Sequence, residues 1–195
     1  ILNGDVELFD SYKMNDEIVS YTSVFGYLAQ VPYVTNKNMK KRLGHAGYVL
    51  SAFPYIIKRP EHYLIEYETD NIIGQANCIL GAITNSKGFG GIDLYKNVSL
   101  NDEKLELLLV RNANPKLIAS LVSDYISNTI DLNKYKDYLI MDSSSNIRLT
   151  FKETYPKFAF DNDGEKSNEI ITYGNDTVIY KPAKKIKILK RKVQD

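Results

Sequence analysis

Two carboxylates on either side of one glycine are the residues best spaced for chemistry. Asp163 and Glu165 flank Gly164 in the stretch Phe158-Ala-Phe-Asp-Asn-Asp-Gly-Glu165, which begins with strand-like alternation and ends in turn residues. If both face one solvent-open site, one can accept a proton from an attacking hydroxyl while the other orders a metal ion or phosphate. The alternative is an ordinary surface turn, which these eight residues alone favour because Asp-Gly is a common turn dipeptide.

The elements that must position this pair are mostly strands. Runs rich in β-branched and aromatic residues, separated by turn residues, predict strands at 6–9, 18–25, 63–69, 72–84, 105–110, 138–141, 147–151, 157–160, 169–173, 178–180 and 185–189. Asn15-Asp16 and Asp70-Asn71 are the predicted hairpin turns, the latter because it tolerates positive φ. The long run 72–84 ends in apolar residues, which indicates a central, buried strand.

Two segments have helical periodicity instead. Apolar residues recur at three- and four-residue steps between Asn36 and Phe53, before Pro54. Asn114-Pro115 supplies an N-cap and a first-turn proline for a second helix that extends to about Tyr125. The pattern therefore predicts a mainly β fold with two helices, arranged as a two-layer antiparallel β-sandwich, with residues 1–195 as a single domain.

Composition limits the classes of function. The net charge of +1 gives no steering toward nucleic acid, and 44% hydrophobic with 25% charged residues is typical of a globular protein. A single cysteine, Cys78, excludes an intramolecular disulfide and fits the reducing cytoplasm. No apolar stretch is long enough to cross a membrane. Because Ile1 is not an initiator residue, we expect a fragment of a longer chain.

Other candidate sites have weaker signals. The Gly88-Phe-Gly-Gly91 loop could bring backbone amides to a phosphate or lipid headgroup, or could be only a turn. The acidic loop Asn101-Asp-Glu103, with Glu106, could hold a hard cation, and a solvated turn is its alternative. The basic segment 184–192 is explained either by a lysine-protected edge strand or by attraction to an anionic membrane surface. His45 and His62 lack ligand-spaced partners and are assigned no role.

The order of these motifs resembles a known family. Phe9-Asp10 with Ser23-Val-Phe-Gly26, then Leu43-Gly-His-Ala-Gly-Tyr-Val-Leu50, are similar to the start of the second domain of soluble bacterial diacylglycerol kinases and related lipid kinases. Further along, Asn85 with Gly90-Gly91, Val98-Ser-Leu-Asn-Asp102 and finally Asp163-Gly-Glu165 resemble that family's motifs. The resemblance covers nearly the whole chain.

The resemblance implies the C-terminal β-sandwich domain of an enzyme that transfers the γ-phosphate of ATP to a lipid hydroxyl. The family's Gly-Gly-Asp-Gly-Thr nucleotide motif is absent here, so ATP would be held largely by an N-terminal domain that this chain lacks. By the same resemblance Asp163 is the general base, Gly164 and Glu165 contact the cofactor and help position Mg²⁺, and Asp102 binds a structural Mg²⁺. Glu103 and Asn97 depart from the family pattern, which usually has Gly and often Asp there, and weaken the predicted metal site.

The expected protein is therefore a cytoplasmic enzyme, most simply a diacylglycerol kinase, that meets its lipid at a membrane surface and is inactive as this chain alone. The lipid acceptor and the oligomeric state stay open, although exposed sheet edges could pair two copies. Two alternatives remain: a non-catalytic β-sandwich that binds carbohydrate or lipid, and an NAD-kinase-like homologue that phosphorylates a soluble dinucleotide.

Overall fold

Residues 5–26, 61–89, 92–158, 160–166 and 170–190 are described by a computed structural model of the chain. The helix predicted between Asn36 and Phe53 lies outside the described residues. In the part of the chain that the structure describes, the only helix is α3 (Pro115–Ile126), and no helix there is long and apolar enough to span a membrane. The predicted second helix is thus confirmed, with its predicted start.

Strands make up most of the remaining fold. Those of the main sheet are β2 (Tyr12–Met14), β3 (Glu17–Val19), β4 (Thr22–Gly26), β5 (Tyr63–Thr69), β6 (Ile73–Thr84), β9 (Leu105–Arg111), β10 (Leu139–Ser144), β11 (Ile147–Phe151), β13 (Asp161–Asn162), β14 (Glu165–Lys166) and β16 (Asp176–Pro182). Three two-stranded ribbons are separate from it: β1 (Asp5–Phe9) with β17 (Ile186–Lys190), β7 (Gly88–Phe89) with β8 (Ile92–Asp93), and β12 (Thr154–Phe158) with β15 (Ile170–Tyr173).

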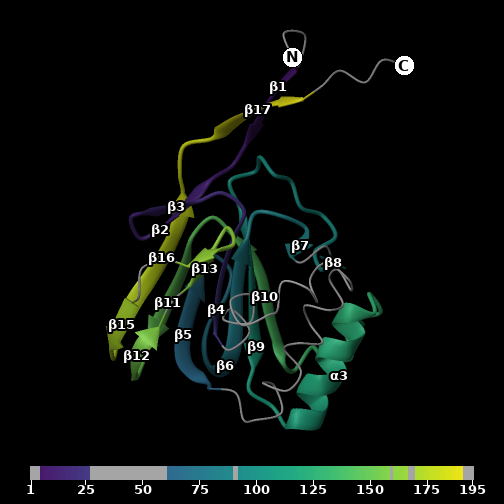
Figure 1. The fold of residues 1–195 in the computed structure, drawn as a ribbon, viewed down its shortest axis with the longest axis vertical. Coiled ribbons are helices and arrows are strands. Elements are labelled where there is room, and N and C mark those ends of the chain that lie inside the picture. The colour runs from purple at the N-terminus through teal and green to yellow at the C-terminus, as the bar shows by residue number, and fades with distance from the viewer. Residues whose placement is uncertain (1–4, 27–60, 90–91, 159, 167–169, 191–195) are drawn as a thin grey trace, which may run out of the picture.

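The main sheet is antiparallel, has eleven strands and is nearly closed. Its strand order is β14-β13-β4-β6-β5-β11-β16-β2-β3; in addition, β9 pairs with β6, and β10 pairs with β9. Figure 1 labels most of these strands. The mainly β class predicted from the sequence is confirmed. The predicted division into two stacked layers is not confirmed, because the strands are hydrogen-bonded into one strongly curved sheet.

The inner face of the curved sheet encloses an aromatic core. Phe25 is fully buried there, and its ring meets those of Tyr63, Phe151 and Phe160 edge-on, with centroids 6.1, 5.5 and 5.3 Å away. Edge-on contacts of this kind add to the free energy of burying each ring. Because Phe25 lies in β4 and Phe160 directly precedes β13, this core fixes the strand that leads to the Asp163 turn.

A second core lies between the sheet and helix α3. Leu108 and Val110 of β9 point toward Ile118 and Val122 of the helix, while alternate residues of β9 point into the inner core. A strand buried on both faces has a nearly continuous apolar sequence, as β9 has. The helix begins where the sequence predicts, because the Asn114 side chain accepts a hydrogen bond from the backbone N–H of Leu117 at 2.9 Å.

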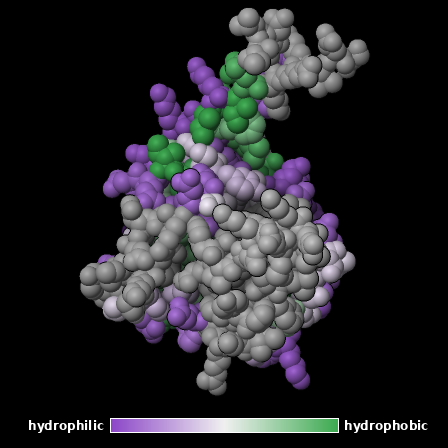
Figure 2. Space-filling model, in the orientation of Figure 1, coloured by the Kyte–Doolittle hydropathy of each residue, from purple (hydrophilic) through white to green (hydrophobic). Residues whose placement is uncertain are grey.

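The β1–β17 ribbon projects from the body of the sheet (Figure 1). It exposes large apolar side chains, which give the green cluster near the upper end of the molecule in Figure 2: Val6, Leu8, Ile188 and Leu189. Its strands pair antiparallel, with Val6 opposite Leu189 and Glu7 opposite Ile188. Contacts between apolar side chains directly across the two strands, such as Val6 and Leu189, stabilise a ribbon that has little core of its own.

Local patterns predict the longer strands but not the short strands β2, β7, β8, β13 and β14. The predicted strand 18–25 is two strands, β3 and β4, interrupted at Ser20 and Tyr21. The Asp70-Asn71 turn forms as predicted but without positive φ; the Asp70 carboxylate instead accepts hydrogen bonds from the 144–146 turn. In that setting the serine hydroxyls and amides hold the pKa of Asp70 well below its usual range.

Candidate functional site

The Asp163-Gly164 turn joins the short strands β13 and β14. Both turn residues have positive φ, 55° at Asp163 and 87° at Gly164, as a two-residue hairpin of this kind requires. The Gly164 N–H donates to the Asp161 carboxylate at 2.9 Å. Strand β13 in turn pairs with β4, so the hairpin extends the edge of the main sheet.

The Asp163 carboxylate is held by the backbone of the β3–β4 connection. The Ser20 N–H donates to Oδ2 at 2.7 Å, and the N–H groups of Tyr21 and Thr22 donate to Oδ1 at 2.7 and 2.9 Å. The Asp163 N–H returns a bond to the Thr22 carbonyl at 2.8 Å. These contacts explain the interruption between β3 and β4, because N–H groups that could extend a ladder are directed to the carboxylate.

This arrangement leaves room for chemistry at one oxygen. A carboxylate oxygen accepts about two hydrogen bonds. Among the described residues Oδ1 already has two donors and Oδ2 has one, so Oδ2 can accept one more. The side chain is exposed, and a hydroxyl could reach this position from solvent.

Glu165 follows on β14, directly across the hairpin from Asn162, and its side chain is exposed. The sequence prediction that Asp163 and Glu165 face one site stays a prediction. Asn162 itself is fixed: its side chain accepts from the Ser23 hydroxyl at 2.7 Å and donates to Glu17 at 2.8 Å. The hairpin that carries both carboxylates is thereby tied to β4 and β3 by side chains as well as by backbone.

The loop of Asp102 lies in the same hydrogen-bonded network as the Asp163 turn, through Asn85. The Asn85 N–H donates to the Tyr21 carbonyl at 2.9 Å, and its side-chain amide donates to the Asp10 carbonyl at 2.7 Å. Asp10 in turn accepts from the Glu103 N–H at 2.7 Å. Asp102 is exposed, and its carboxylate accepts the Lys104 N–H at 3.2 Å. The Mg²⁺ site predicted at Asp102 stays a prediction.

Glu106 is a buried acid beside this loop. It is 2% exposed, accepts a hydrogen bond from the Ser143 hydroxyl at 3.2 Å, and leaves Oε2 without a partner among the described residues. Burial raises the pKa of Glu106 to about 7, and the nearby charge of Asp102 adds to the increase. The sequence pattern groups Glu106 with a surface acidic loop, but it is a member of the strand β9.

We expect Glu106 to make stability depend on pH. Since its pKa is about 7 in the folded chain and 4.5 in the reference state, the folded chain binds the proton more tightly. Stability should therefore fall as pH rises from about 4.5 to 7 and then level off, by roughly 2–3 kcal/mol in all. Urea unfolding at pH 5 and pH 8 should show this loss in the natural chain and a much smaller one in Glu106→Gln. Equal losses in the two proteins would contradict the prediction.

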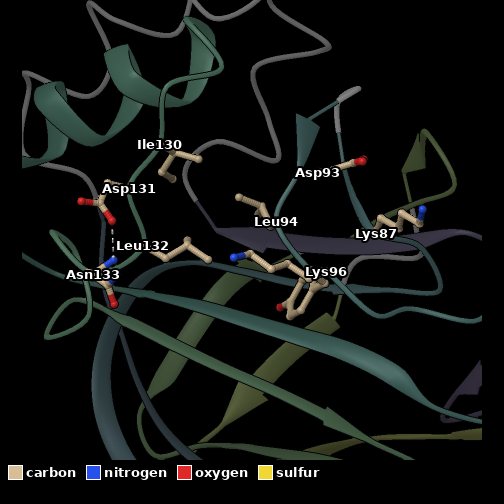
Figure 3. A pocket seen from close by; sticks show the side chains of 9 residues that line it. Lys87, Asp93, Leu94, Lys96, Ile130, Asp131, Leu132 and Asn133 are labelled. Atoms are coloured by element: carbon tan, nitrogen blue, oxygen red, sulfur yellow. Dashed lines mark hydrogen bonds between the residues drawn. The ribbon is translucent and has the colours of Figure 1, made fainter.

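A separate hollow of about 390 Å³ lies between the β7–β8 ribbon and the segment after α3 (Figure 3). Leu94, Ile130 and Leu132 form its apolar part, Asp131 lies on one side, Lys87 and Asp93 lie on the other, and Lys96 lies between them. Its lining carries both signs of charge, so it indicates no particular ligand. Asp163, Glu165 and Asp102 do not line this hollow. Gly90 and Gly91 of the predicted glycine-rich loop lie outside the described residues.

The fold and the hairpin define a class of protein, a curved antiparallel β-domain with an aspartate turn at the edge of its sheet. Comparison with known proteins shows which proteins this domain resembles. No family model matches the chain. A protein of Staphylococcus carnosus (strain TM300) named "Putative lipid kinase" is 25% identical over 167 residues, 85% of this chain and 52% of that protein. A protein of Staphylococcus saprophyticus named "Diacylglycerol kinase" is 29% identical over 115 residues, 58% of this chain and 37% of that protein.

Solved structures agree with this likeness. A crystal structure from Bacillus anthracis str. Sterne, described as a "putative diacylglycerol kinase", matches with a TM-score of 0.64 at 19% identity and covers 92% of this chain and 54% of that chain. At such identity the match shows the fold. Together the comparisons confirm the resemblance to bacterial diacylglycerol and lipid kinases. The chain spans about half the length of the Staphylococcus carnosus protein.

Sequence reasoning misses the partners of the predicted site residues. Lys185 and the Ser20–Thr22 amides are absent from the predicted site, and Asp10 enters only as part of the Phe9-Asp10 resemblance, yet these groups hold Asp163 and the Asp102 loop in place. No local signal marks them, because Asp163 lies 142 residues from Tyr21. Asn85 stands out in the sequence only through the family resemblance, and its bridging role emerges from the fold.

Proposed function

We propose that this chain is the lipid-substrate domain of an ATP-dependent lipid kinase and carries its catalytic base. The supporting observation is the Asp163 carboxylate, which is fixed by three backbone N–H groups on an anchored hairpin and keeps one accepting position open. The names of the relatives supply the reaction class. The acceptor that fits those names best is diacylglycerol, with phosphatidic acid as the product.

In this proposal the chain's own residues position and deprotonate the acceptor. Asp163 Oδ2 accepts the proton of the lipid hydroxyl as the hydroxyl oxygen bonds to the γ-phosphorus and the bond from that phosphorus to the bridging oxygen breaks, leaving ADP. Gly164 and Glu165 lie beside the transferred phosphate. Mg²⁺ bound with ATP would neutralise phosphate charge, and the exposed Glu165 carboxylate is an oxygen ligand suited to it.

The test uses the natural full-length protein that contains this chain. With ATP, Mg²⁺ and mixed micelles of diacylglycerol, labelled phosphate should enter the organic phase. Label that enters only a soluble dinucleotide would overturn the lipid proposal in favour of an NAD-kinase-like enzyme. If no phosphate is transferred to any member of a panel of lipids with free hydroxyl groups, and the protein binds a sugar or a lipid saturably, a non-catalytic binding module would be favoured.

We also expect the 195-residue chain alone to be inactive. Phosphoryl transfer depends on positioning and charge neutralisation, and ATP would be held largely by a second domain, in keeping with a chain that spans about half of its relatives. Purified chain and full-length protein should be assayed side by side at equal concentration in the micelle assay. Turnover by the chain alone that approaches the full-length rate would contradict this prediction.

A further inference from the structure

The Lys185 ammonium lies among three side-chain oxygens of the Asp102 neighbourhood. Its Nζ is 2.6 Å from Asn101 Oδ1, 3.2 Å from Asp10 Oδ1 and 3.3 Å from Glu103 Oε1. Lys185 belongs to the basic segment whose sequence predicts an edge strand or a membrane surface. The structure instead turns this lysine inward, toward the turn at residues 100–103.

Asp10 is the buried member of this group. Its side chain is 5% exposed, its Oδ2 accepts the Glu103 N–H at 2.7 Å, and its own N–H donates to the Leu100 carbonyl at 2.8 Å. A buried carboxylate is strongly destabilising unless hydrogen bonds and an opposite charge compensate it. The Lys185 ammonium supplies that charge from a segment far away in sequence.

The same point joins three segments at the base of the β1–β17 ribbon. The Ser11 hydroxyl donates to the Lys184 carbonyl at 2.6 Å, and the Ala183 N–H donates to the Ser11 carbonyl at 2.8 Å. With the contacts of Lys185, these bonds hold residues 10–11, 101–103 and 183–185 together. The ammonium is therefore placed where a single cation can fix both the turn and the start of the ribbon.

A divalent ion that used these side-chain oxygens would have to displace the ammonium. Mg²⁺ requires six oxygen ligands, some of them water, at about 2.0–2.1 Å in octahedral geometry. Here Asp10 and Glu103 face the ammonium, whereas Asp102 is exposed and accepts from its own loop. Among the described residues no group of three or more acidic, histidine or cysteine side chains is gathered for a metal.

We infer that Lys185 is the built-in cation of this loop and takes the place of a structural divalent ion. Although partial burial opposes it, hydrogen bonding to Asp10 and Glu103 raises the pKa of Lys185, so the side chain keeps its charge. The fold around Asp102 then needs no metal. This inference does not depend on the proposed kinase activity, where Mg²⁺ enters with ATP.

The first measurement is the melting temperature of the 195-residue chain with EDTA and with millimolar MgCl₂ or CaCl₂. A bound structural ion would raise the melting temperature with concentration, and we expect a shift of less than about 1 °C. A rise of several degrees that Asp102→Asn abolishes would overturn the inference. That outcome would place a divalent ion at the Asp102 loop. The test needs no substitution at Lys185, so it does not depend on whether a Lys185 variant folds.

The second measurement compares lysine variants. Lys185→Met should lower the melting temperature by roughly 5 °C or more, because the buried Asp10 loses its counter-charge. Lys184→Met, at the exposed neighbouring position, is the matched control and should change it little. Lys185→Arg keeps the charge and should stay folded and insensitive to Mg²⁺. Equal effects of Lys185→Met and Lys184→Met would overturn the inference.

Discussion

If the proposed function holds, Asp163→Asn should lower the turnover number for lipid phosphorylation by the natural full-length protein by roughly 10²–10⁴-fold, the usual contribution of a general base. The amide keeps the size of the side chain but cannot take the proton of the lipid hydroxyl. The measurement is organic-phase phosphate transfer at saturating diacylglycerol, so that a change in lipid affinity is not mistaken for lost chemistry.

The structural work of Asp163 must be separated from this chemical role. In the variant one oxygen becomes an NH₂ group, which opposes the Ser20 N–H or those of Tyr21 and Thr22. We expect a stability loss of about 1–3 kcal/mol from these broken hydrogen bonds. The folded fraction of the variant should therefore be measured by circular dichroism at the assay temperature and used to correct the rate.

Asp16→Asn provides the matched control. Asp16 is an exposed aspartate in the β2–β3 hairpin. Its neighbour Asn15 has positive φ, as Asp163 has in its own hairpin. It should keep the activity of the natural protein. If the corrected rate of Asp163→Asn equals that of Asp16→Asn, Asp163 serves only to join the hairpin to the β3–β4 connection, and the general base lies elsewhere.

The sequence predicts those features of the fold that depend on neighbouring residues, and misses those that depend on contacts between residues far apart in the chain. The sequence predicts strand β6 and the start of α3 to within one residue, because apolar runs, an Asn cap and a first-turn proline act locally. The break between β3 and β4 is not predictable in this way. It is made by a carboxylate that lies far away in the sequence, and periodicity carries no information on such contacts.

The candidate site shows the same division. The types and spacing of Asp163 and Glu165 permit acid–base chemistry but by themselves favour an ordinary surface turn, and the Asp-Gly turn that the sequence predicts is present. The Lys185 contact with Asp10 is not predicted, because alternating lysines near a chain end resemble a solvated edge strand. Lys185 points inward because it pairs with the buried Asp10 carboxylate. This pairing depends on how the curved sheet brings residues 10–11 and 183–185 together.

Gly81→Ala should destabilise the chain by about 3 kcal/mol, the upper range for forcing an extra methyl group into a packed core. Gly81 lies on β6 opposite Phe25 of β4, and a Cβ at this position would overlap the Phe25 ring. The ring cannot move aside freely, because it is fully buried and is held edge-on by Phe151 and Phe160. Urea unfolding at constant pH measures the loss.

Gly164→Ala is the comparison that separates overlap from backbone strain. No atom lies within 4 Å of a Cβ at Gly164 in the described part of the chain, so only its φ of 87° opposes alanine, at a cost of about 1–2 kcal/mol.

The overlap between a Cβ at position 81 and the Phe25 ring is tested by removing the ring. In a Phe25→Leu background, Gly81→Ala should destabilise the chain by less than about 1 kcal/mol, because neighbouring changes that relieve one clash are not additive. An equal cost in both backgrounds would mean that the Phe25 ring is not what requires glycine there, and that the aromatic core fixes β4 and the Asp163 hairpin less tightly than its packing indicates.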